Sequence, residues 1–238
     1  MFGREAPQEN CAGGKIDIEG RGTFMGQEQK GILIVVSGFS GAGKGTIIRE
    51  LLKKHDDYAL SVSMTTRDPR PGERDGVEYF FTDKKHFEET IRQNGLIEYA
   101  PYCGNYYGTP RAYVEEQLEM GKNVILEIEI QGALKIKDKF PESLLIFLMP
   151  PSAEELKRRL ESRGTESADQ IGRRLARAVE ESEGVEAYDY IVVNDRLEEC
   201  AEEIHMLVDA ARRAPVRRKE LIREIRDELY CFAKGVQK

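Results

Sequence analysis

The sequence has no tryptophan and is poor in residues that bind metals or form disulfides, with four cysteines and three histidines among 238 residues. The cysteines stand at positions 11, 103, 200 and 231 without C-x-x-C spacing, and the histidines at 55, 86 and 205 are scattered along the chain. This pattern indicates neither a zinc site nor a disulfide framework. It predicts a protein of a reducing compartment, the cytoplasm.

Long apolar runs are also missing from the sequence. No stretch approaches the roughly 20 apolar residues needed to cross a bilayer, and the N-terminus has no apolar signal core. The chain carries 43 acidic and 36 basic residues, a net charge of -7, which argues against a general nucleic-acid binder. We therefore expect neither a membrane nor a nucleic-acid partner, and any anionic ligand must be held by a local cluster of cations.

The two ends of the chain differ in composition from the middle. Residues 1–30 hold six glycines and little apolar periodicity, which predicts a disordered extension. Within it, Ile18-Glu19-Gly20-Arg21 resembles a processing-protease site used in fusion linkers, and Met25 is an alternative native start. Residues 211–238 predict a basic helix that docks on the body of the chain or on a second subunit of a homo-oligomer.

Residues 31–210 are predicted to form a single α/β domain, because short apolar runs alternate with amphipathic stretches as in a doubly wound parallel sheet. The runs predict strands at 32–37, 58–63, 123–128, 143–149 and 190–193. Helices are expected at 44–55, 110–120, 152–162, 168–183 and 197–212. Residues 64–108 break the alternation with strand-like pieces at 78–81 and 96–100 and a helix at 84–93, which predicts a lobe inserted after the second strand.

A glycine-rich segment follows the first predicted strand and matches the pattern G-x-x-x-x-G-K. Between a buried strand and a helix, such a segment exposes backbone N–H groups beside a lysine charge, which suits a polyphosphate. Gly45 stands where Ser or Thr usually follows the lysine, and the next hydroxyl belongs to Thr46, one residue further along. The sequence pattern therefore leaves open which residue binds magnesium. The predicted phosphate-binding loop, or P-loop, consists of Gly38, Phe39, Ser40, Gly41, Ala42, Gly43, Lys44, Gly45 and Thr46.

Two arginines, Arg67 and Arg70, lie three residues apart in a proline-bearing turn. Guanidinium groups hold phosphate through paired hydrogen bonds, so the pair suggests a second phosphate site apart from the P-loop. One site for a donor and one for an acceptor indicates phosphoryl transfer. The pair alone is weak support, because arginines in charged loops are usually only solvated.

Four further segments follow this turn: Asp75-Gly76-Val77-Glu78-Tyr79-Phe80-Phe81, Ile97-Glu98-Tyr99-Ala100, Gly104-Asn105-Tyr106-Tyr107-Gly108-Thr109 and Leu126-Glu127-Ile128-Glu129-Ile130-Gln131-Gly132. With the P-loop and Val193-Asn194-Asp195, this series resembles the guanylate kinase family from about residue 31 to residue 210. The resemblance implies an α/β P-loop NTPase fold with a parallel five-stranded core sheet. It also implies an inserted GMP-binding lobe at about 64–108 and a lid at about 159–178.

The resemblance implies an acceptor site for GMP, in which arginines and tyrosines bind the phosphate and Glu98 reads the base. The carboxylate would accept hydrogen bonds from N1–H and the exocyclic amine of guanine. Adenine presents an acceptor at N1, so an unpaired buried carboxylate would discriminate against it by roughly 10⁴ or more. The implied GMP-binding residues are Ser63, Arg67, Arg70, Tyr79, Glu98, Tyr107, Thr109 and Glu129.

The donor side is implied in the same way. ATP would occupy the P-loop with Asn194 near its adenine, and Mg²⁺ would be the cofactor, bound by Thr46 or by water. Lid arginines would close over the phosphates, with Arg159 as a further candidate. The implied catalytic residues are Lys44, Arg67, Arg163 and Arg174.

The implied reaction transfers the γ-phosphoryl group of ATP to GMP, and to dGMP because no assigned group requires the ribose 2′-hydroxyl. Two positions depart from the family pattern: Glu129 stands where many relatives have aspartate, and Gly45 makes the loop resemble that of adenylate kinases. Glu98 argues against an adenylate kinase, and the lack of Asn-Lys-x-Asp argues against a GTPase. The alternative from another class is a non-catalytic guanylate-kinase-like module that binds phosphopeptides; such modules usually have a damaged P-loop, whereas Lys44 is present here.

Overall fold

The structure is a computed structural model that describes residues 30–102, 104–162 and 167–234. The predicted N-terminal extension therefore lies outside the described residues except for Lys30. Arg163, a predicted lid residue, also lies outside them. The described chain divides into two units, the first running to Arg213 and the second beginning at Ala214.

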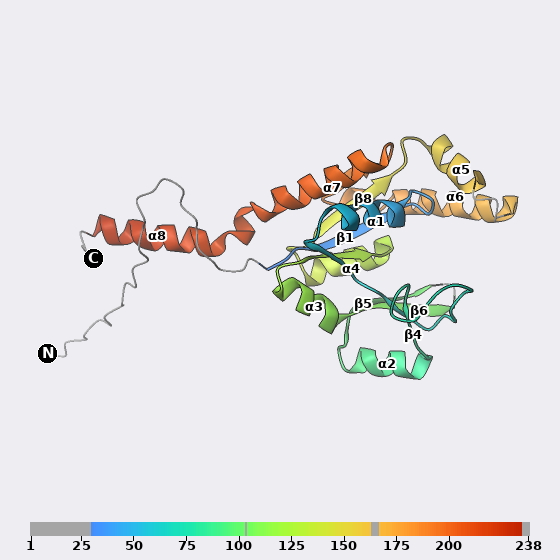
Figure 1. Cartoon of the computed structure of the whole chain (residues 1–238), viewed down its shortest axis with the longest axis horizontal. Helices are drawn as coiled ribbons and strands as arrows, with labels where there is room; N and C mark the ends of the chain where they lie inside the picture. The colour runs from blue at the N-terminus through green and yellow to red at the C-terminus, as the bar shows by residue number, and fades with distance from the viewer. Residues whose placement is uncertain (1–29, 103, 163–166, 235–238) are drawn as a thin grey trace. The chain divides into compact units, whose positions relative to one another are not determined.

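A parallel five-stranded sheet forms the centre of the first unit (Figure 1). The strand order is β2-β7-β1-β8-β9, so that Val35 in the middle strand pairs with Leu126 of β7 and Leu145 of β8. All six residues of β1 are buried, as expected of a central parallel strand covered on both faces. The strands are β1 (Leu33–Gly38), β2 (Tyr58–Leu60), β7 (Asn123–Glu127), β8 (Leu144–Met149) and β9 (Tyr190–Val193).

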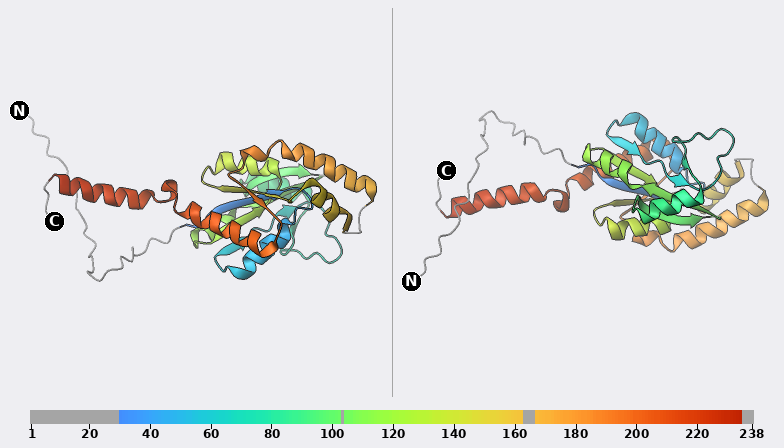
Figure 2. Two further views of the ribbon diagram at one scale, coloured as in Figure 1. Left: turned by 90° about the horizontal axis from the view of Figure 1, so that it is seen from above. Right: turned by 90° about the horizontal axis from the view of Figure 1, so that it is seen from below.

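Helices cover both faces of this sheet, and alternate residues of β1 point to different ones (Figure 2). Ile34 and Val36 pack into the apolar cluster formed with α1 (Lys44–Lys54) and α7 (Leu197–Arg212). Leu33 and Val35 pack into the opposite cluster, which includes residues of α3 (Arg111–Glu119) and α4 (Ile130–Lys139). The remaining helical elements of this unit outside the lobe are α5 (Ala153–Ser162), α6 (Ala168–Ser182) and η1 (Val185–Ala187).

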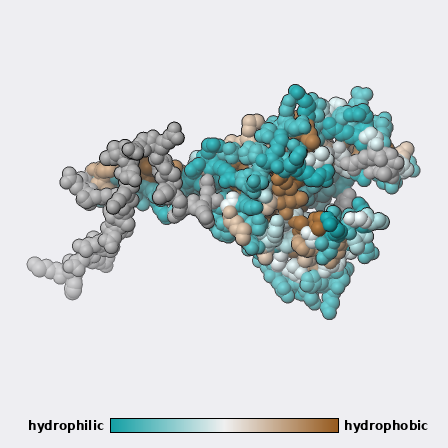
Figure 3. Space-filling model, viewed as in Figure 1, coloured by the Kyte–Doolittle hydropathy of each residue, from teal (hydrophilic) through white to brown (hydrophobic). Residues whose placement is uncertain are grey.

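The inserted lobe is built on a second sheet with the strand order β4-β3-β6-β5. Phe87 of α2 (Lys84–Arg92) is fully buried and stacks on Tyr106, with ring centroids 5.4 Å apart. Hydrophobic residues reach the visible surface mainly between this lobe and the core (Figure 3). The lobe strands are β3 (Met64–Thr65), β4 (Phe80–Phe81), β5 (Leu96–Tyr102) and β6 (Asn105–Pro110).

All five predicted core strands are present, but the prediction missed helix α4 and lobe strands β3 and β6. Helix α4 begins directly after Glu129 and carries Gly132 in its first turn, where glycine lowers helix propensity. Strand β3 has only two residues, too few for a period-two pattern. Strand β2 ends at Leu60, earlier than predicted. Among the described residues, none of the helices combines the length and apolarity that crossing a membrane requires.

The C-terminal unit contains the short helix η2 (Pro215–Arg217) and the longer helix α8 (Lys219–Ala233). Its large apolar residues are exposed, including Leu229 at 61% and Phe232 at 77%. Helix α8 has no buried residue. The helix therefore presents an apolar stripe among charged residues, as its sequence spacing indicated.

Replacing Phe147 by alanine is expected to lower the free energy of unfolding by about 3–5 kcal/mol. The ring is fully buried in β8 and makes edge contacts with Phe39 and Tyr188, at centroid distances of 5.0 and 5.1 Å. Urea unfolding followed by circular dichroism measures the change. The same substitution at exposed Phe232 should stay within about 0.5 kcal/mol. Equal effects at the two positions would contradict this account of the core.

Candidate functional site

The P-loop lies at the carboxyl end of the central strand, between the last residue of β1, Gly38, and the first residue of α1, Lys44. Gly43 caps the helix in the left-handed region, with φ 92°. A Cβ atom there would come within 2.5 Å of Nδ2 of Asn194, so both conformation and space require glycine. This is the site that open parallel sheets offer to ligands.

Asn194, predicted to lie near an adenine, is 8% exposed and contacts the back of the P-loop. Its Nδ2 donates to the carbonyl of Ala42 at 2.7 Å, and its own carbonyl accepts from Nη2 of Arg159 at 2.9 Å. The first contact ties the loop to the residue that follows β9, and the second ties that residue to α5. They favour a positioning role for Asn194 and Arg159, which the sequence did not indicate.

A cavity of about 310 Å³ opens over the P-loop. Lys44 Nζ donates to the carbonyl of Gly38 at 2.7 Å, so its charge is folded back on its own loop. Two charged residues that sequence reasoning missed, Arg49 and Glu127, also line the cavity. A Cβ on Gly45 would lie 3.7 Å from Glu127 Oε2 and 3.9 Å from Arg49 Nη1, which is ordinary van der Waals contact, so a small side chain would also fit there.

Thr46, the tentative metal ligand, lines this cavity together with Glu127. The Thr46 hydroxyl accepts a hydrogen bond from Nη2 of Arg49 at 3.3 Å. Desolvation raises the pKa of Glu127, and the charges of Lys44 and Arg49 oppose that shift. A hydroxyl and a carboxylate are oxygen donors of the kind that Mg²⁺ prefers, so the donor set fits the predicted ion.

Helix α6 brings two arginines to the site. Arg174, a predicted lid residue, donates from Nη1 to the hydroxyl of Ser40 in the P-loop. Arg177, which was not predicted, donates from Nη2 to Glu129 at 3.3 Å and from Nε to Glu181 at 2.8 Å. Glu129, predicted to contact guanine, is therefore paired with an arginine of α6 in this structure.

In the acceptor lobe, Arg67 is held by a carboxylate that sequence reasoning missed. Nη2 of Arg67 lies 2.9 Å from both carboxylate oxygens of Glu73, and its guanidinium lies 5.3 Å from the centroid of the Tyr79 ring. The backbone N–H of Arg70, at 2.7 Å, and then Arg67 hold the pKa of Glu73 below its usual value. The side chain of Arg70 is exposed.

The two predicted phosphate-binding tyrosines lie together. Tyr79 and Tyr107 meet edge to face with ring centroids 5.8 Å apart. Burial, and then the neighbouring Tyr107, raises the pKa of the Tyr79 phenol, so the group stays protonated and able to donate. Ser63 is joined to this region through its backbone, because its carbonyl accepts a hydrogen bond from the N–H of Phe80, the residue after Tyr79, at 2.9 Å.

Glu98 occupies the interior of the lobe on β5 and is only 5% exposed. Its Oε1 accepts a hydrogen bond from the hydroxyl of Thr109 at 2.8 Å, which joins two predicted base-pocket residues. Burial raises the pKa of Glu98, and the Thr109 hydrogen bond and the charges of Lys135 and Lys139 oppose the rise. A Cβ on Gly132 would lie 3.1 Å from Oε2, so glycine in α4 gives this carboxylate its space.

Two of the histidines that are scattered along the sequence meet in the fold. His55 and His205 are distant in sequence, yet their rings stack with centroids 3.7 Å apart, and Asp57 lies beside them. Packing of α1 against α7 brings the two segments together. The cluster lies apart from the P-loop, because His55 follows the end of α1 opposite to Lys44.

Two candidate sites with different chemistry result from this arrangement. The P-loop cavity combines backbone N–H groups with the charges of Lys44 and Arg49, as a polyphosphate requires. The lobe combines Arg67 and two phenols with a buried carboxylate, Glu98, which suits a ligand with both a phosphate and N–H donors. Such a pair can align one phosphorylated molecule with another.

Comparisons with known proteins agree with this geometry. A family model described as guanylate kinase matches residues 30–211. A guanylate kinase of Oceanobacillus iheyensis is 52% identical over 181 residues, covering 76% of this chain and 88% of that protein. A guanylate kinase of Caldanaerobacter subterraneus subsp. tengcongensis is 47% identical over 204 residues, covering 86% of this chain and 99% of the relative.

The fold has a counterpart among solved structures. The crystal structure of a guanylate kinase from Anaplasma phagocytophilum superposes with a TM-score of 0.65 at 35% sequence identity, covering 79% of this chain and 90% of that one. The α/β P-loop NTPase fold predicted from the sequence is thereby confirmed. With a family match over most of its length and relatives at about half identity, the chain belongs to the guanylate kinase family.

Proposed function

We infer that this protein is an ATP:GMP phosphotransferase, which converts ATP and GMP into ADP and GDP. The observation that carries this conclusion is the combination of an intact P-loop lysine, Lys44, with a buried base-reading carboxylate, Glu98, in a member of the guanylate kinase family. The non-catalytic phosphopeptide module is not favoured, because such a module has no use for a complete donor loop.

Recognition of GMP is assigned to the inserted lobe. Glu98 accepts from guanine N1–H and the exocyclic amine, while the Thr109 hydroxyl holds the carboxylate in place at 2.8 Å. Arg67, Arg70 and the phenols of Tyr79 and Tyr107 bind the phosphate. Glu73 now pairs with Arg67, so GMP must share or replace that carboxylate as a partner.

Transfer is assigned to the P-loop and the lid. Lys44 moves from the carbonyl of Gly38 to the phosphates of ATP, and Arg174 remains close to them through Ser40. These cations offset charge on the phosphoryl group as it passes directly to GMP, so the mechanism needs no covalent enzyme intermediate. When bound at Thr46 and Glu127, Mg²⁺ supplies further charge neutralisation.

The proposal also covers a second substrate, the metabolic pathway and the cellular compartment. dGMP is a second acceptor, because the assigned residues contact the base and phosphate and leave the ribose 2′-hydroxyl unused. The reaction belongs to purine nucleotide metabolism, and we place it in the cytoplasm. Arg163 and Arg174 act together as lid cations.

The substrate assignment is tested by giving the purified chain ATP, Mg²⁺ and each nucleoside monophosphate in turn. GMP and dGMP should be phosphorylated, whereas AMP should react with a kcat/KM roughly 10⁴-fold lower, since its N1 acceptor faces the Glu98 carboxylate. Coupled detection of ADP, with product identity by chromatography, measures each rate. Preference for AMP would overturn the assignment to GMP.

Replacing Lys44 by alanine should lower kcat by about 10²–10³, because one charge that stabilises the transferring phosphoryl group is removed. Steady-state ADP release at saturating ATP and GMP measures this change. Lys53 lies on the same helix with its side chain 78% exposed, so Lys53→Ala is the matched control and should keep full activity. Unchanged turnover in Lys44→Ala would remove the P-loop lysine from the mechanism.

Replacing Glu98 by glutamine should lower kcat/KM for GMP by about 10- to 150-fold, because a charge-assisted hydrogen bond of about 1.5–3 kcal/mol is lost. The same change should stabilise the free protein at neutral pH. Burial raises the pKa of Glu98 in the folded state, so ionisation costs folding free energy as pH rises above the unfolded pKa. The advantage of the glutamine variant should therefore vanish in acid.

Kinetics and urea unfolding at several pH values measure these two effects on the same preparation. Glu116 is exposed on α3, so Glu116→Gln serves as the control for loss of a carboxylate charge. It should change neither kcat/KM nor the dependence of stability on pH. A glutamine variant at position 98 that binds GMP normally would show that this carboxylate does not read the base.

A further inference from the structure

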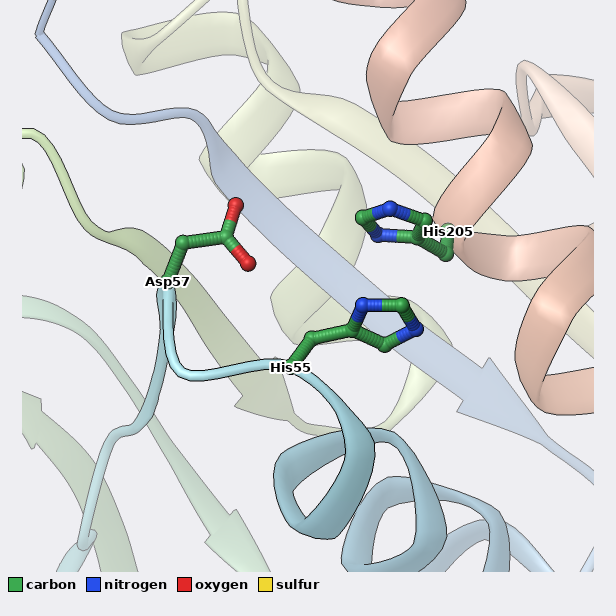
Figure 4. Close-up of side chains that lie close together, drawn as sticks. All are labelled: His55, Asp57 and His205. Atoms are coloured by element: carbon green, nitrogen blue, oxygen red, sulfur yellow. The ribbon is translucent and has the colours of Figure 1, made fainter.

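Two histidines and an aspartate converge where the end of α1 meets α7 (Figure 4). His55 follows the last residue of α1, Asp57 directly precedes β2, and His205 projects from α7. One ligand atom from each residue lies within 4.8 Å of the other two. All three side chains are partly exposed, so an ion from solvent has access to them.

We propose that His55, Asp57 and His205 form a binding site for one divalent transition metal ion of the zinc class. Two imidazole nitrogens and one carboxylate oxygen are ligands that Zn²⁺ and Co²⁺ accept. This site is separate from the predicted magnesium position at Thr46. It also extends beyond the proposed phosphoryl transfer, which does not use these residues.

The ring of His55 offers one of its two nitrogens to the cluster. Nδ1 faces Asp57, whereas Nε2 points away from it (Figure 4). Glu202 Oε1 lies 3.7 Å from Nε2, so Glu202 would orient the ring from behind as Nδ1 binds the ion. Water would complete a fourfold coordination shell.

The surroundings of the other two ligands fit the same role. Nδ1 of His205 lies 2.9 Å from the hydroxyl of Tyr58, which leaves Nε2 for the ion and provides the hydrogen-bonded support typical of a metal-binding histidine. Asp57 Oδ2 accepts from Nδ2 of Asn123 at 2.9 Å and from Nη2 of Arg212 at 2.8 Å. These bonds hold the carboxylate in position and leave its other oxygen as a ligand.

Loading the site requires a local rearrangement. Tetrahedral ligands around zinc lie about 3.3 Å apart, closer than the 4.8 Å limit here. The imidazole planes are within 15° of parallel, and an ion lies in the plane of each ring that binds it, so one ring must turn. When the ring turns, the contact between the stacked rings is replaced by two bonds to the metal ion. The positive charges of Lys54 and Arg212 lie nearby and oppose binding of a cation.

The role of the ion follows from its position. Helix α1 has 11 residues and therefore runs about 16 Å from Lys44 to its end beside His55. An ion at this end joins α1 to α7 and lies outside the P-loop cavity. It is expected to stabilise the fold without taking part in phosphoryl transfer.

Titration of the nucleotide-free protein with ZnCl₂ in a calorimeter, in neutral buffer without chelators, tests the proposal. The wild-type chain should bind one ion with a rise in Tm, and His55→Ala and His205→Ala should each weaken binding at least tenfold. His86 lies on α2 of the inserted lobe, away from this cluster, so His86→Ala is the matched control and should bind like the wild type. Equal affinity in all four proteins would overturn the proposal.

Titration with Co²⁺ keeps the test decisive if a histidine variant fails to fold. Bound Co²⁺ in the wild-type chain should show visible absorption of a site with nitrogen and oxygen ligands, and no thiolate charge-transfer band in the near ultraviolet. A thiolate band would place the ion on cysteine and contradict the assignment. Absence of any Co²⁺ or Zn²⁺ binding by the wild-type chain would contradict it as well.

Discussion

The rest of the site depends on the complete burial of β1. Because helices pack on both faces of this strand, its carboxyl end is fixed and the chain must turn at once into α1. Position 43 of the turn requires glycine, since a side chain there would collide with Asn194. Asn194 in turn bonds Ala42, so the same crowding that demands glycine also holds the phosphate-binding N–H groups in place.

A second constraint is electrostatic. Two cations assigned to phosphate bind oxygen atoms of the protein itself, Lys44 the carbonyl of Gly38 and Arg67 the carboxylate of Glu73, and Arg177 of α6 binds the carboxylate of Glu129 in the same way. Each bond keeps a cation ordered and offsets the repulsion between like charges. A phosphate group that binds Lys44 or Arg67 must therefore compete with these oxygen atoms.

The sequence was sufficient to predict the core sheet, because each buried strand is a continuous apolar run. It was also sufficient to predict the P-loop, because the turn requires glycine at fixed positions. It was insufficient wherever pairing depends on the third dimension. Nothing in the sequence near Arg67 indicates that Glu73 is its ion-pair partner, and nothing near His55 indicates that its ring stacks on His205 of α7. Helix α4 was missed because Gly132 weakens its helical signal, although the space that this glycine leaves accommodates Glu98.

Glu98 and the histidine cluster differ in what they are proposed to contribute, the first to function and the second to stability. In the lobe, burial of the ionisable Glu98 carboxylate works against folding, and under the proposed function that cost is offset by discrimination between purines. At the far end of α1, the stacked imidazoles contribute nothing to phosphoryl transfer, so their polar atoms are available to a ligand that stabilises the scaffold. Because α1 begins at Lys44 and ends beside His55, an ion at one end would stabilise the helix that presents the P-loop lysine at the other.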